Sequence, residues 1–376
     1  MSHRLHGINY RVLTTMLVVA LPVLVIGSYV VIERGQTRLL DAFGVKLSQR
    51  AEQSAAAIDA YVYRQVVDVS TLARVPEIRA EAEQGSRRPA SASHDAELDR
   101  AFGAREIGRA DVAAILGTPA SKFFADITRQ DPIYRELLLT DRWGRLVAAS
   151  NLPSDYRQDD EAWWRRVMAD PTRGEATVGD VRWDDSARMY GMEFAVPVPG
   201  ADERPVGVLK VVADVREMLA SVAGMDLGDA GDAMLVRHNG SIVFSRDAVQ
   251  PSARFFAADR LRERLDAAAA TAGPATLYFT ATDATGVAEV VGVATSQLSS
   301  TYPHLPWAVV AWQPEDDLLA PVRSQSWSLF ALLGLTGFCV IAAAAWFSIT
   351  LAPRPIDTEM HLVPHAPIHR FEEESV

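Results

Sequence analysis

Two long uncharged runs limit what this chain can fold into. Residues 12–32 and residues 324–353 carry no charged side chain over 21 and 30 positions. About 20 apolar residues are enough to cross the hydrocarbon core of a bilayer, and neither run has the polar face expected of a helix buried against one protein core. The sequence therefore predicts transmembrane helices at residues 12–32 and 324–351. The first run is longer than a secretory signal core and lacks a clear cleavage site, which favours an anchor over a cleaved signal peptide.

The flanking charges and the cysteine content indicate where the rest of the chain lies. Two arginines precede the first run and two follow the second, so the positive-inside rule places residues 1–11 and 352–376 in the cytoplasm. The single cysteine, Cys339, lies in the second run, which excludes a disulfide framework in residues 33–323 and suits a bacterial periplasm. We expect a two-pass protein of the bacterial cytoplasmic (inner) membrane with a periplasmic main domain.

The charge balance and the motifs exclude several functional classes. Most of the formal net charge of −11 lies in residues 33–323, and an acidic domain is repelled by nucleic acid and by anionic lipid. There is no Gly-rich phosphate loop, Gly-x-Ser-x-Gly or His-Glu-x-x-His motif. His361, His365 and His369 are spaced as metal ligands on a helix would be, but two intervening prolines oppose that helix. We expect no enzyme, no metal or cofactor site, and no nucleic-acid partner.

One long helix is predicted at residues 33–75. From Leu40 to Leu72, apolar residues recur at spacings of three and four, as on one face of a helix, and Pro76 ends the pattern. Such a stripe covers its own domain, forms the seam of a parallel homodimer, or does both. The sequence leaves these alternatives open, and we expect a homodimer.

Two similar strand–turn–strand units follow this helix. The turn of the first ends at Gly144, and the turn of the second contains the Asn239-Gly240 pair, a strong hairpin signal. The two glycines are 96 residues apart, and a short helix and further strands follow each unit. The repeated order predicts an internal duplication of one α+β module, at residues 76–222 and 223–323, rather than two unrelated domains.

The order of anchor, long helix, two α+β modules and anchor resembles the double Cache family of bacterial extracytoplasmic sensors. The resemblance implies an α+β fold in which a long N-terminal helix and two PAS-like Cache modules lie between two transmembrane helices. It also implies a small-molecule ligand in the membrane-distal module, residues 76–222, and signalling by a dimer across the membrane. Four segments carry the resemblance: LLTDRWG at 138–144, DDEAWW at 159–164, VGVLKVVADV at 206–215 and LPWAVVAWQP at 305–314.

The resemblance further implies a set of ligand-binding residues. Amino-acid-sensing members of this family hold their ligand with a Tyr, an Arg five residues later, an aromatic pair and a later Asp, which here correspond to Tyr156, Glu161, Trp163, Trp164 and Asp214. Because Glu161 replaces the arginine that clamps a ligand carboxylate, we expect a ligand with an amine or other cation and no essential carboxylate. Structural roles are the alternative, since Glu161 suits a first helical turn and one of two adjacent tryptophans should face the core.

Two further residues are candidates for binding the ligand, and the C-terminal end of the sequence bears on how a signal would leave the protein. Asp180 and Tyr190 lie on predicted strands beside the same pocket. Only 25 residues, four of them proline, follow the second predicted transmembrane helix at residues 324–351, so we expect no HAMP linker or output domain there. We therefore expect a sensor subunit that signals to a separate kinase, receptor or other output protein. The alternative is a passive periplasmic binding or assembly module without signalling output.

Overall fold

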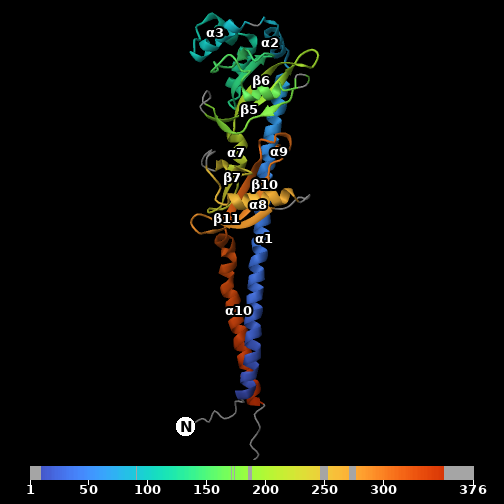
Figure 1. Ribbon diagram of the computed structural model, residues 1–376. Coiled ribbons are helices and arrows are strands. Elements are labelled where there is room, and N and C mark those ends of the chain that lie inside the picture. The colour runs from blue at the N-terminus through green and yellow to red at the C-terminus, as the bar shows by residue number, and fades with distance from the viewer. Residues whose placement is uncertain are drawn as a thin grey trace, which may run out of the picture. The chain divides into compact units, whose positions relative to one another are not determined.

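The structure, a computed structural model, describes residues 10–89, 91–170, 172, 174–184, 189–245, 253–270 and 277–350 (Figure 1). The chain divides into two compact units, of which one is Gln36–Pro321 and the other combines Met1–Gly35 with Val322–Val376. The predicted cytoplasmic tail at residues 352–376, with its three histidines, lies outside the described residues, as does most of the predicted N-terminal segment.

Two long helices contain the uncharged runs. Helix α1 spans Tyr10–Leu72 and helix α10 spans Glu315–Thr350, so both runs are helical as far as the described residues reach. Within that part of the chain, no helix combines the length and the apolar character that crossing a membrane requires. The predicted transmembrane helices at residues 12–32 and 324–351 are therefore not confirmed as membrane spans.

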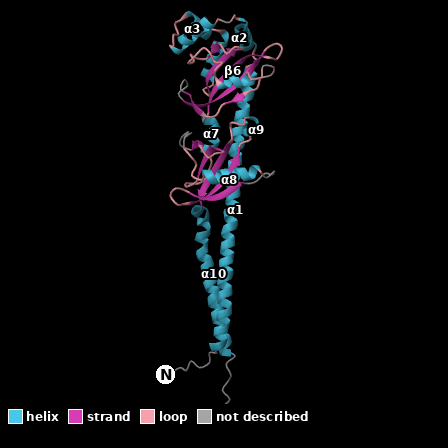
Figure 2. Ribbon diagram, viewed as in Figure 1, coloured by secondary structure: helices cyan, strands magenta, loops and turns pink. Residues whose placement is uncertain are grey.

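The unit Gln36–Pro321 contains two antiparallel sheets (Figure 2). The first has the strand order β2-β1-β6-β5-β3, with β4 paired to β5, and the second has the order β8-β7-β11-β10-β9. The strands of the first sheet are β1 (Tyr134–Asp141), β2 (Leu146–Ala149), β3 (Thr177–Val178), β4 (Arg182–Asp184), β5 (Met189–Pro199) and β6 (Pro205–Asp214). Those of the second are β7 (Asp232–Arg237), β8 (Ile242–Ser245), β9 (Leu277–Thr282), β10 (Ala288–Thr295) and β11 (Trp307–Pro314).

The two sheets share one topology. In each, the first strand lies between its hairpin partner and the last strand of the sheet. In each hairpin the register shifts just before the turn, at Thr140 in β1 and at Val236 in β7. Each turn ends in a glycine with positive φ, 77° at Gly144 and 80° at Gly240, where residues with a Cβ are strained. The repeated order of elements that the sequence predicts is thus present in both sheets, and an internal duplication of one module stays a prediction.

Helices complete each module. The first module comprises the first sheet and helices α2 (Pro76–Arg87), α3 (Ala92–Gly103), α4 (Ala110–Leu116), α5 (Pro119–Gln130) and α6 (Ala162–Val167). The second module comprises the second sheet and helices α8 (Ala258–Ala269) and α9 (Leu298–Thr301), and α7 (Arg216–Ala223) connects the two.

Local sequence explains where these helices begin. Helices α2 and α5 start with a proline, which tolerates the first helical position because that N–H has no partner in the helix. At the start of α5, the Thr118 side chain accepts a hydrogen bond from the Ser121 N–H, 3.1 Å away. The mixed α+β fold with a long N-terminal helix and two sheets is the class that the sequence predicts.

The apolar stripe of α1 is buried within the chain itself. Leu47, Ala51, Ile58, Tyr61 and Val69 are at most 8% exposed and belong to one hydrophobic core together with residues of both modules. Burial of this stripe is a large favourable contribution to folding, at roughly 1.5–3 kcal/mol for each large side chain.

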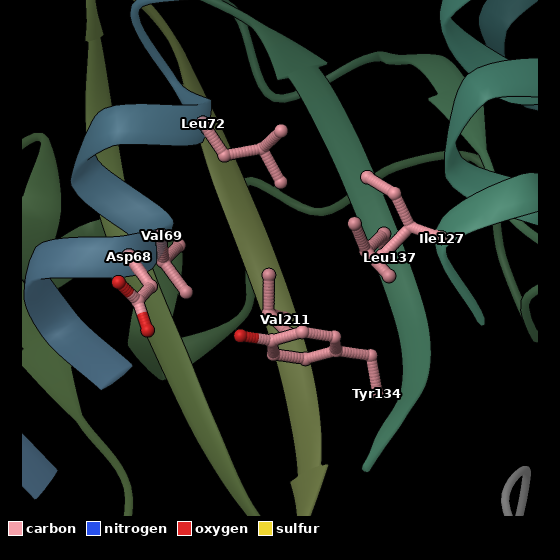
Figure 3. Close-up of a pocket in the computed structure, with 7 residues that line it drawn as sticks. All are labelled: Asp68, Val69, Leu72, Ile127, Tyr134, Leu137 and Val211. Carbon is pink, nitrogen blue, oxygen red and sulfur yellow. The ribbon is translucent and has the colours of Figure 1, made fainter. Parts of the chain in front are cut away.

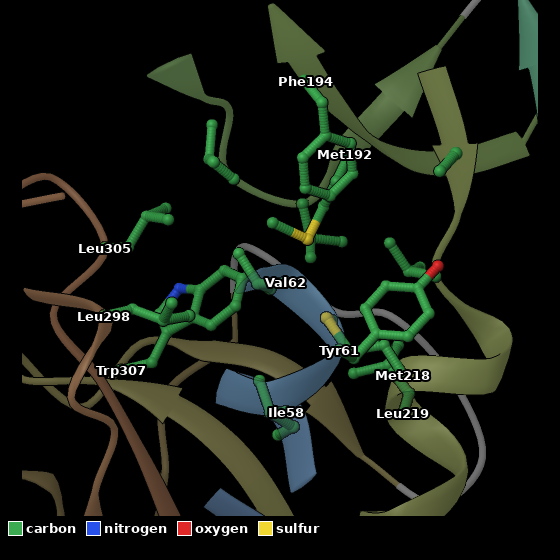
Figure 4. Packing of buried hydrophobic residues seen from close by; sticks show 14 of the residues in the cluster. Ile58, Tyr61, Val62, Met192, Phe194, Met218, Leu219, Leu298, Leu305 and Trp307 are labelled. Atoms are coloured by element: carbon green, nitrogen blue, oxygen red, sulfur yellow. The ribbon is translucent and has the colours of Figure 1, made fainter. Parts of the chain in front are cut away.

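Figure 4 shows this core around α1. Met192 of the first sheet and Trp307 of the second lie on either side of Ile58 and Val62. The stripe therefore covers the chain's own domain. The alternative, in which the same stripe forms a dimer seam, is wrong for these positions because their side chains are already enclosed by one chain.

Candidate ligand-binding site

Helix α6 places two tryptophans over one face of the first sheet. Trp163 is 1% exposed and packs with Val167, Ala195 and Val208. Neighbours on a helix point about 100° apart, so Trp164 lies at the edge of this contact and is only partly buried. The sequence-based expectation that one of the pair faces the core holds for Trp163.

Three charged side chains lie on the sheet face that α6 covers. Glu136 of β1, Glu193 of β5 and Lys210 of β6 are called the Lys210 cluster below. Their side chains are 5%, 9% and 12% exposed, and Lys210 Nζ lies 3.7 Å from Glu136 Oε2 and 4.0 Å from Glu193 Oε2. The same Nζ lies 5.4 Å from the ring centroid of Trp163. Strand alternation sends the side chains next to them to the opposite face, toward α1.

Opposite charges lower the energetic cost of burying the Lys210 cluster. Isolated buried charges are costly, whereas paired and hydrogen-bonded ones are tolerated. Lys210 is shared between two carboxylates, and Arg182 of β4 pairs with Glu193 as well. The Trp163 ring adds a cation–π contact of about 0.5–2 kcal/mol. The two carboxylates are thus balanced by two cations, the buried Lys210 and Arg182, whose side chain is 60% exposed.

The tryptophans of α6 also leave hydrogen-bonding capacity in the site. In the described part of the chain, the indole N–H groups of Trp163 and Trp164 are buried without a hydrogen-bond partner. A buried donor left unpaired costs about 1–3 kcal/mol. An acceptor atom of a bound molecule would relieve that cost, so the arrangement suits a small molecule that carries both an acceptor and a charged group.

Tyr156 and Glu161 precede α6, and Tyr156 has structural partners. Tyr156 is 3% exposed in a separate core cluster with Phe102 of α3, whose ring centroid is 5.9 Å away. Burial raises the pKa of Tyr156 to about 12, so its phenol stays neutral. Glu161 occupies the N-cap position of α6, one residue before the first helical turn in which the structural alternative placed it, and its side chain does not cap the helix.

Asp214, at the end of β6, is held by arginines. Its Oδ2 lies 2.7 Å from Arg216 Nη2 and 3.2 Å from Arg135 Nη2. Burial acts to raise the pKa of Asp214, but the hydrogen bonds from Arg216 and Arg135 outweigh it and hold the pKa below its ordinary value. Asp214 and Tyr190 both line a cavity of about 710 Å³ to which the α6 tryptophans do not contribute.

Asp180 joins the two modules. Its Oδ2 lies 2.8 Å from both Nε and Nη2 of Arg237 in β7. The seven residues predicted from sequence therefore separate into three places. Trp163 and Trp164 lie in α6, which Tyr156 and Glu161 precede; Tyr190 and Asp214 lie at the 710 Å³ cavity, and Asp180 lies between the modules.

A family comparison identifies this arrangement. The sequence model of the Cache domain matches residues 39–322 of the chain. The chain belongs to the Cache domain family. Cache domains are extracytoplasmic modules of chemoreceptors and histidine kinases. They sense and bind ligands and are not themselves the enzymatic part of those proteins. None of the curated proteins matches the chain.

Solved Cache structures include several ligand-binding domains of chemoreceptors. That of Pseudomonas fluorescens CtaA in complex with L-serine is 13% identical, with a TM-score of 0.42 over 73% of this chain and 99% of that one. That of Pseudomonas aeruginosa PctB in complex with L-Arg is 15% identical, with a TM-score of 0.41 over 74% and 97%. That of Campylobacter jejuni Tlp3 in complex with L-valine is 10% identical, with a TM-score of 0.46 over 75% and 97%.

Sequence reasoning missed the three charged residues of the Lys210 cluster. Each stands in a strand that is otherwise mostly apolar and buried, within RELLLTD, MEFAVPVP or VGVLKVVAD. A charged residue inside a buried strand is a usable signal, because it is rare unless paired. That these three meet on one face depends on the order of β1, β6 and β5 in the sheet.

A small cavity lies on the opposite face of the same Cache sheet (Figure 3). It measures about 180 Å³ and is lined by Asp68, Val69 and Leu72 of α1 together with Ile127, Tyr134, Leu137 and Val211. Leu137 and Val211 directly follow Glu136 and Lys210 in their strands and so point the other way. Helix α1 thus packs directly behind the Lys210 cluster, separated from it by one layer of sheet.

Proposed function

We propose that this protein is a membrane-anchored periplasmic sensor subunit that binds a small molecule beneath α6 and passes its occupancy to a separate output protein. The observation that carries the proposal is the Lys210 cluster: buried, balanced charges beneath two tryptophans whose indole N–H groups lack acceptors among the described residues. The first module, residues 76–222, is then the ligand-binding module, and the second, residues 223–323, is the one that follows it toward the output.

The charges of the site favour a ligand with an amine. Lys210 and the largely exposed Arg182 balance the charges of Glu136 and Glu193, but each carboxylate can accept several hydrogen bonds, including those of an ammonium group. The Trp163 face adds attraction for a cation. The indole N–H groups of Trp163 and Trp164 can bind an acceptor such as a hydroxyl, carbonyl or carboxylate oxygen of the same ligand. The ligand class is therefore a small amine that also carries an acceptor.

The route from the site to the output runs through α1. Ligand binding that shifts the Lys210 cluster alters the sheet against which Val69 and Leu72 pack. Further down the helix, the Asp59 carboxylate accepts hydrogen bonds from the Ser296 hydroxyl and the Gln297 N–H of the second module, the latter at 2.8 Å. One rigid helix therefore contacts both modules.

Membrane attachment and dimerisation are further parts of the proposal. The uncharged runs at residues 12–32 and 324–353 support attachment to the bacterial inner membrane. On α1, the face opposite the buried stripe carries Tyr63 and Val67, which are 38% and 61% exposed. Two copies that pack along this face would form the homodimer expected of the chain.

Calorimetric titration of the full-length protein in detergent tests the ligand proposal. The panel contains small amines, amino acids and simple carboxylates. We expect amines with an acceptor group to bind, and Glu193→Gln or Glu136→Gln to weaken them by about tenfold or more, the effect of losing one charge-assisted hydrogen bond. The matched control is Glu203→Gln, which removes an exposed carboxylate and should leave affinity unchanged. If both cluster variants bind the amines as tightly as the parent protein does, the ligand site is not at the Lys210 cluster.

Cross-linking separates the sensor from a passive module. In a Cys339→Ser background, Val67→Cys should form a disulfide-linked dimer, whereas Ile58→Cys, fully buried, should not. A sensor changes the yield of the Val67 cross-link when ligand is added. A yield that is constant across saturating ligand supports the passive alternative.

A further inference from the structure

A second cavity lies where the two modules meet. It measures about 710 Å³, within the range of small-molecule pockets of roughly 300–1,000 Å³. Its walls come from the first sheet, from one face of α7, and from Phe244 on β8 of the second module. We call it the junction cavity. It uses none of the residues of the Lys210 cluster, so it is independent of the proposed α6 site.

One part of the junction cavity is apolar and aromatic. Trp183 and Tyr190 meet edge to face, with ring centroids 5.2 Å apart. Leu219 and Ala223, four residues apart on one face of α7, line the same cavity, as does Phe244 of β8. Side chains of this kind accommodate a flat hydrocarbon body, since aromatic rings favour edge-on or offset contacts with other rings.

The other part is cationic. Arg135 and Arg216 flank Asp214, so two guanidinium groups face one carboxylate and leave a net positive charge. The Nε–H of Arg135 is buried without a hydrogen-bond partner among the described residues. The Arg216 side chain is 80% exposed, which leaves part of its planar fork open. Guanidinium groups bind carboxylates through paired N–H donors.

We propose that the junction cavity is a second ligand site, for a small aryl carboxylate. The ring occupies the apolar part, beside Tyr190 and Phe244, and the carboxylate accepts hydrogen bonds from Arg135 and Arg216. This ligand is opposite in charge to the amine proposed for the α6 site, and the two sites have no residue in common. An anion suits this end of the pocket because the single carboxylate of Asp214 does not neutralise both guanidinium groups.

A ligand in the junction cavity would lie next to both modules and next to a contact of α1. The Tyr61 hydroxyl of α1 donates to the backbone carbonyl of Asp214, 3.2 Å away. Phe244 belongs to the second module and Tyr190 to the first. A ligand that contacts Arg216, Tyr190 and Phe244 together therefore contacts both modules, next to the residue that α1 holds through Tyr61.

Titration of the full-length protein with phenylacetate tests this proposal. Phenethylamine, which carries the same ring with the opposite charge, and acetate, which lacks the ring, are the matched probes. We expect phenylacetate to bind at least about tenfold more tightly than either, the effect of a charge-assisted contact or of burying a ring. Tighter binding of phenethylamine that Ala220→Trp abolishes, or no detectable binding of phenylacetate, contradicts the proposal.

Two substitutions locate the binding. Ala220→Trp places a large side chain on the α7 face that lines the cavity; because Ala220 is exposed, the variant should fold, as its melting temperature will show, and should lose phenylacetate binding. Arg135→Met should lose the preference for phenylacetate over phenethylamine. Glu136→Gln is the control, since it weakens amine binding at the α6 site and leaves phenylacetate affinity unchanged. Phenylacetate affinity that falls in Glu136→Gln but not in Ala220→Trp overturns the junction site without touching the α6 proposal.

Discussion

The two Cache modules share a backbone plan and differ in what lies beneath the helix that covers each sheet. Strand register makes Lys210 of the first sheet equivalent to Val310 of the second, and Glu193 equivalent to Val291. Beneath α6 the equivalent positions are charged; beneath α8 they belong to a hydrocarbon core. The polar site thus depends on a few strand residues and not on the topology, and the second module is the same fold built without that site.

The hairpin turns differ in the same sense. In the first module, Arg145 and Asp141 form an ion pair with side chains 5% and 1% exposed, 2.7 Å apart, and Arg145 also donates to the carbonyl of Gly85 at the end of α2. In the second module, the matching turn begins at Arg237, which instead reaches Asp180 of the first module. One turn stabilises its own module, whereas the other connects the two.

The largest effect is expected from moving a charge between the two sheets. Val310→Lys places an ammonium group in a fully buried position, where Val291 stands in place of Glu193 and only Asp232, the equivalent of Glu136, is charged. We expect the free energy of unfolding to fall by about 3–5 kcal/mol, the range for a buried charge that lacks a partner, as measured by urea denaturation.

The reciprocal substitution sharpens that result. Lys210→Met leaves Glu136 and Glu193 beneath α6 without their shared cation, so it should also lower the free energy of unfolding in urea denaturation. Equal losses for Val310→Lys and for a surface lysine substitution would show that the two sheet faces do not differ as described.

The next effect concerns the two turn arginines. Arg145→Met leaves Asp141 buried and unpaired and should lower the free energy of unfolding by about 3–4 kcal/mol. Arg237→Met removes a pair whose side chains are 19% and 30% exposed, so the loss should stay near or below about 1 kcal/mol. Comparable losses in denaturation of the two variants would contradict the assignment of a structural role to one turn and a connecting role to the other.

The turn glycines should respond alike, because here the modules are the same. A Cβ on Gly144 would lie 2.6 Å from the Cβ of Asp159, and one on Gly240 would lie 2.3 Å from that of Ala258. Together with their positive φ, these contacts predict a loss of about 2 kcal/mol for each Gly→Ala variant. Thermal denaturation of the two single variants is the measurement, and a large effect at only one turn would break the equivalence.

The smallest effect depends on pH and lies in the second module. Burial, followed by the charges of Asp283 and Asp317, raises the pKa of Glu289 to about 7. A raised carboxyl pKa favours the neutral form in the folded state, so its contribution to stability is present at low pH and is lost as pH rises through about 7. Glu289→Gln should therefore match the parent protein at pH 4 and exceed it above pH 8, by on the order of 1–2 kcal/mol. Parallel pH–stability curves for the two proteins would count against it.

The fold could be predicted further than the site. The long helix from Leu40 to Leu72 and both hairpins follow from periodicity and turn residues, which act locally. Glu193 and Lys210 could not be brought together from sequence, because their proximity depends on the pairing of β5 with β6. Asp214 is a different case. The family resemblance implies a ligand contact there, and this stays a prediction; that Arg216, two residues later, donates hydrogen bonds to its carboxylate could not be predicted from a sequence pattern.

Helix α1 determines which parts of this protein can be exchanged with those of its relatives. Its earlier part serves the second module, where Ser48 donates to the carbonyl of Leu277, and its later part serves the first, where Tyr61 donates to that of Asp214. In a hybrid protein joined near residue 223, the second sheet would come from a relative while the α1 residues that pack against it would come from this protein. A second module taken from a relative would therefore have to be exchanged together with residues 36–59 of α1, which pack against it. Because both sheets pack on this one helix, they are expected to change together in evolution.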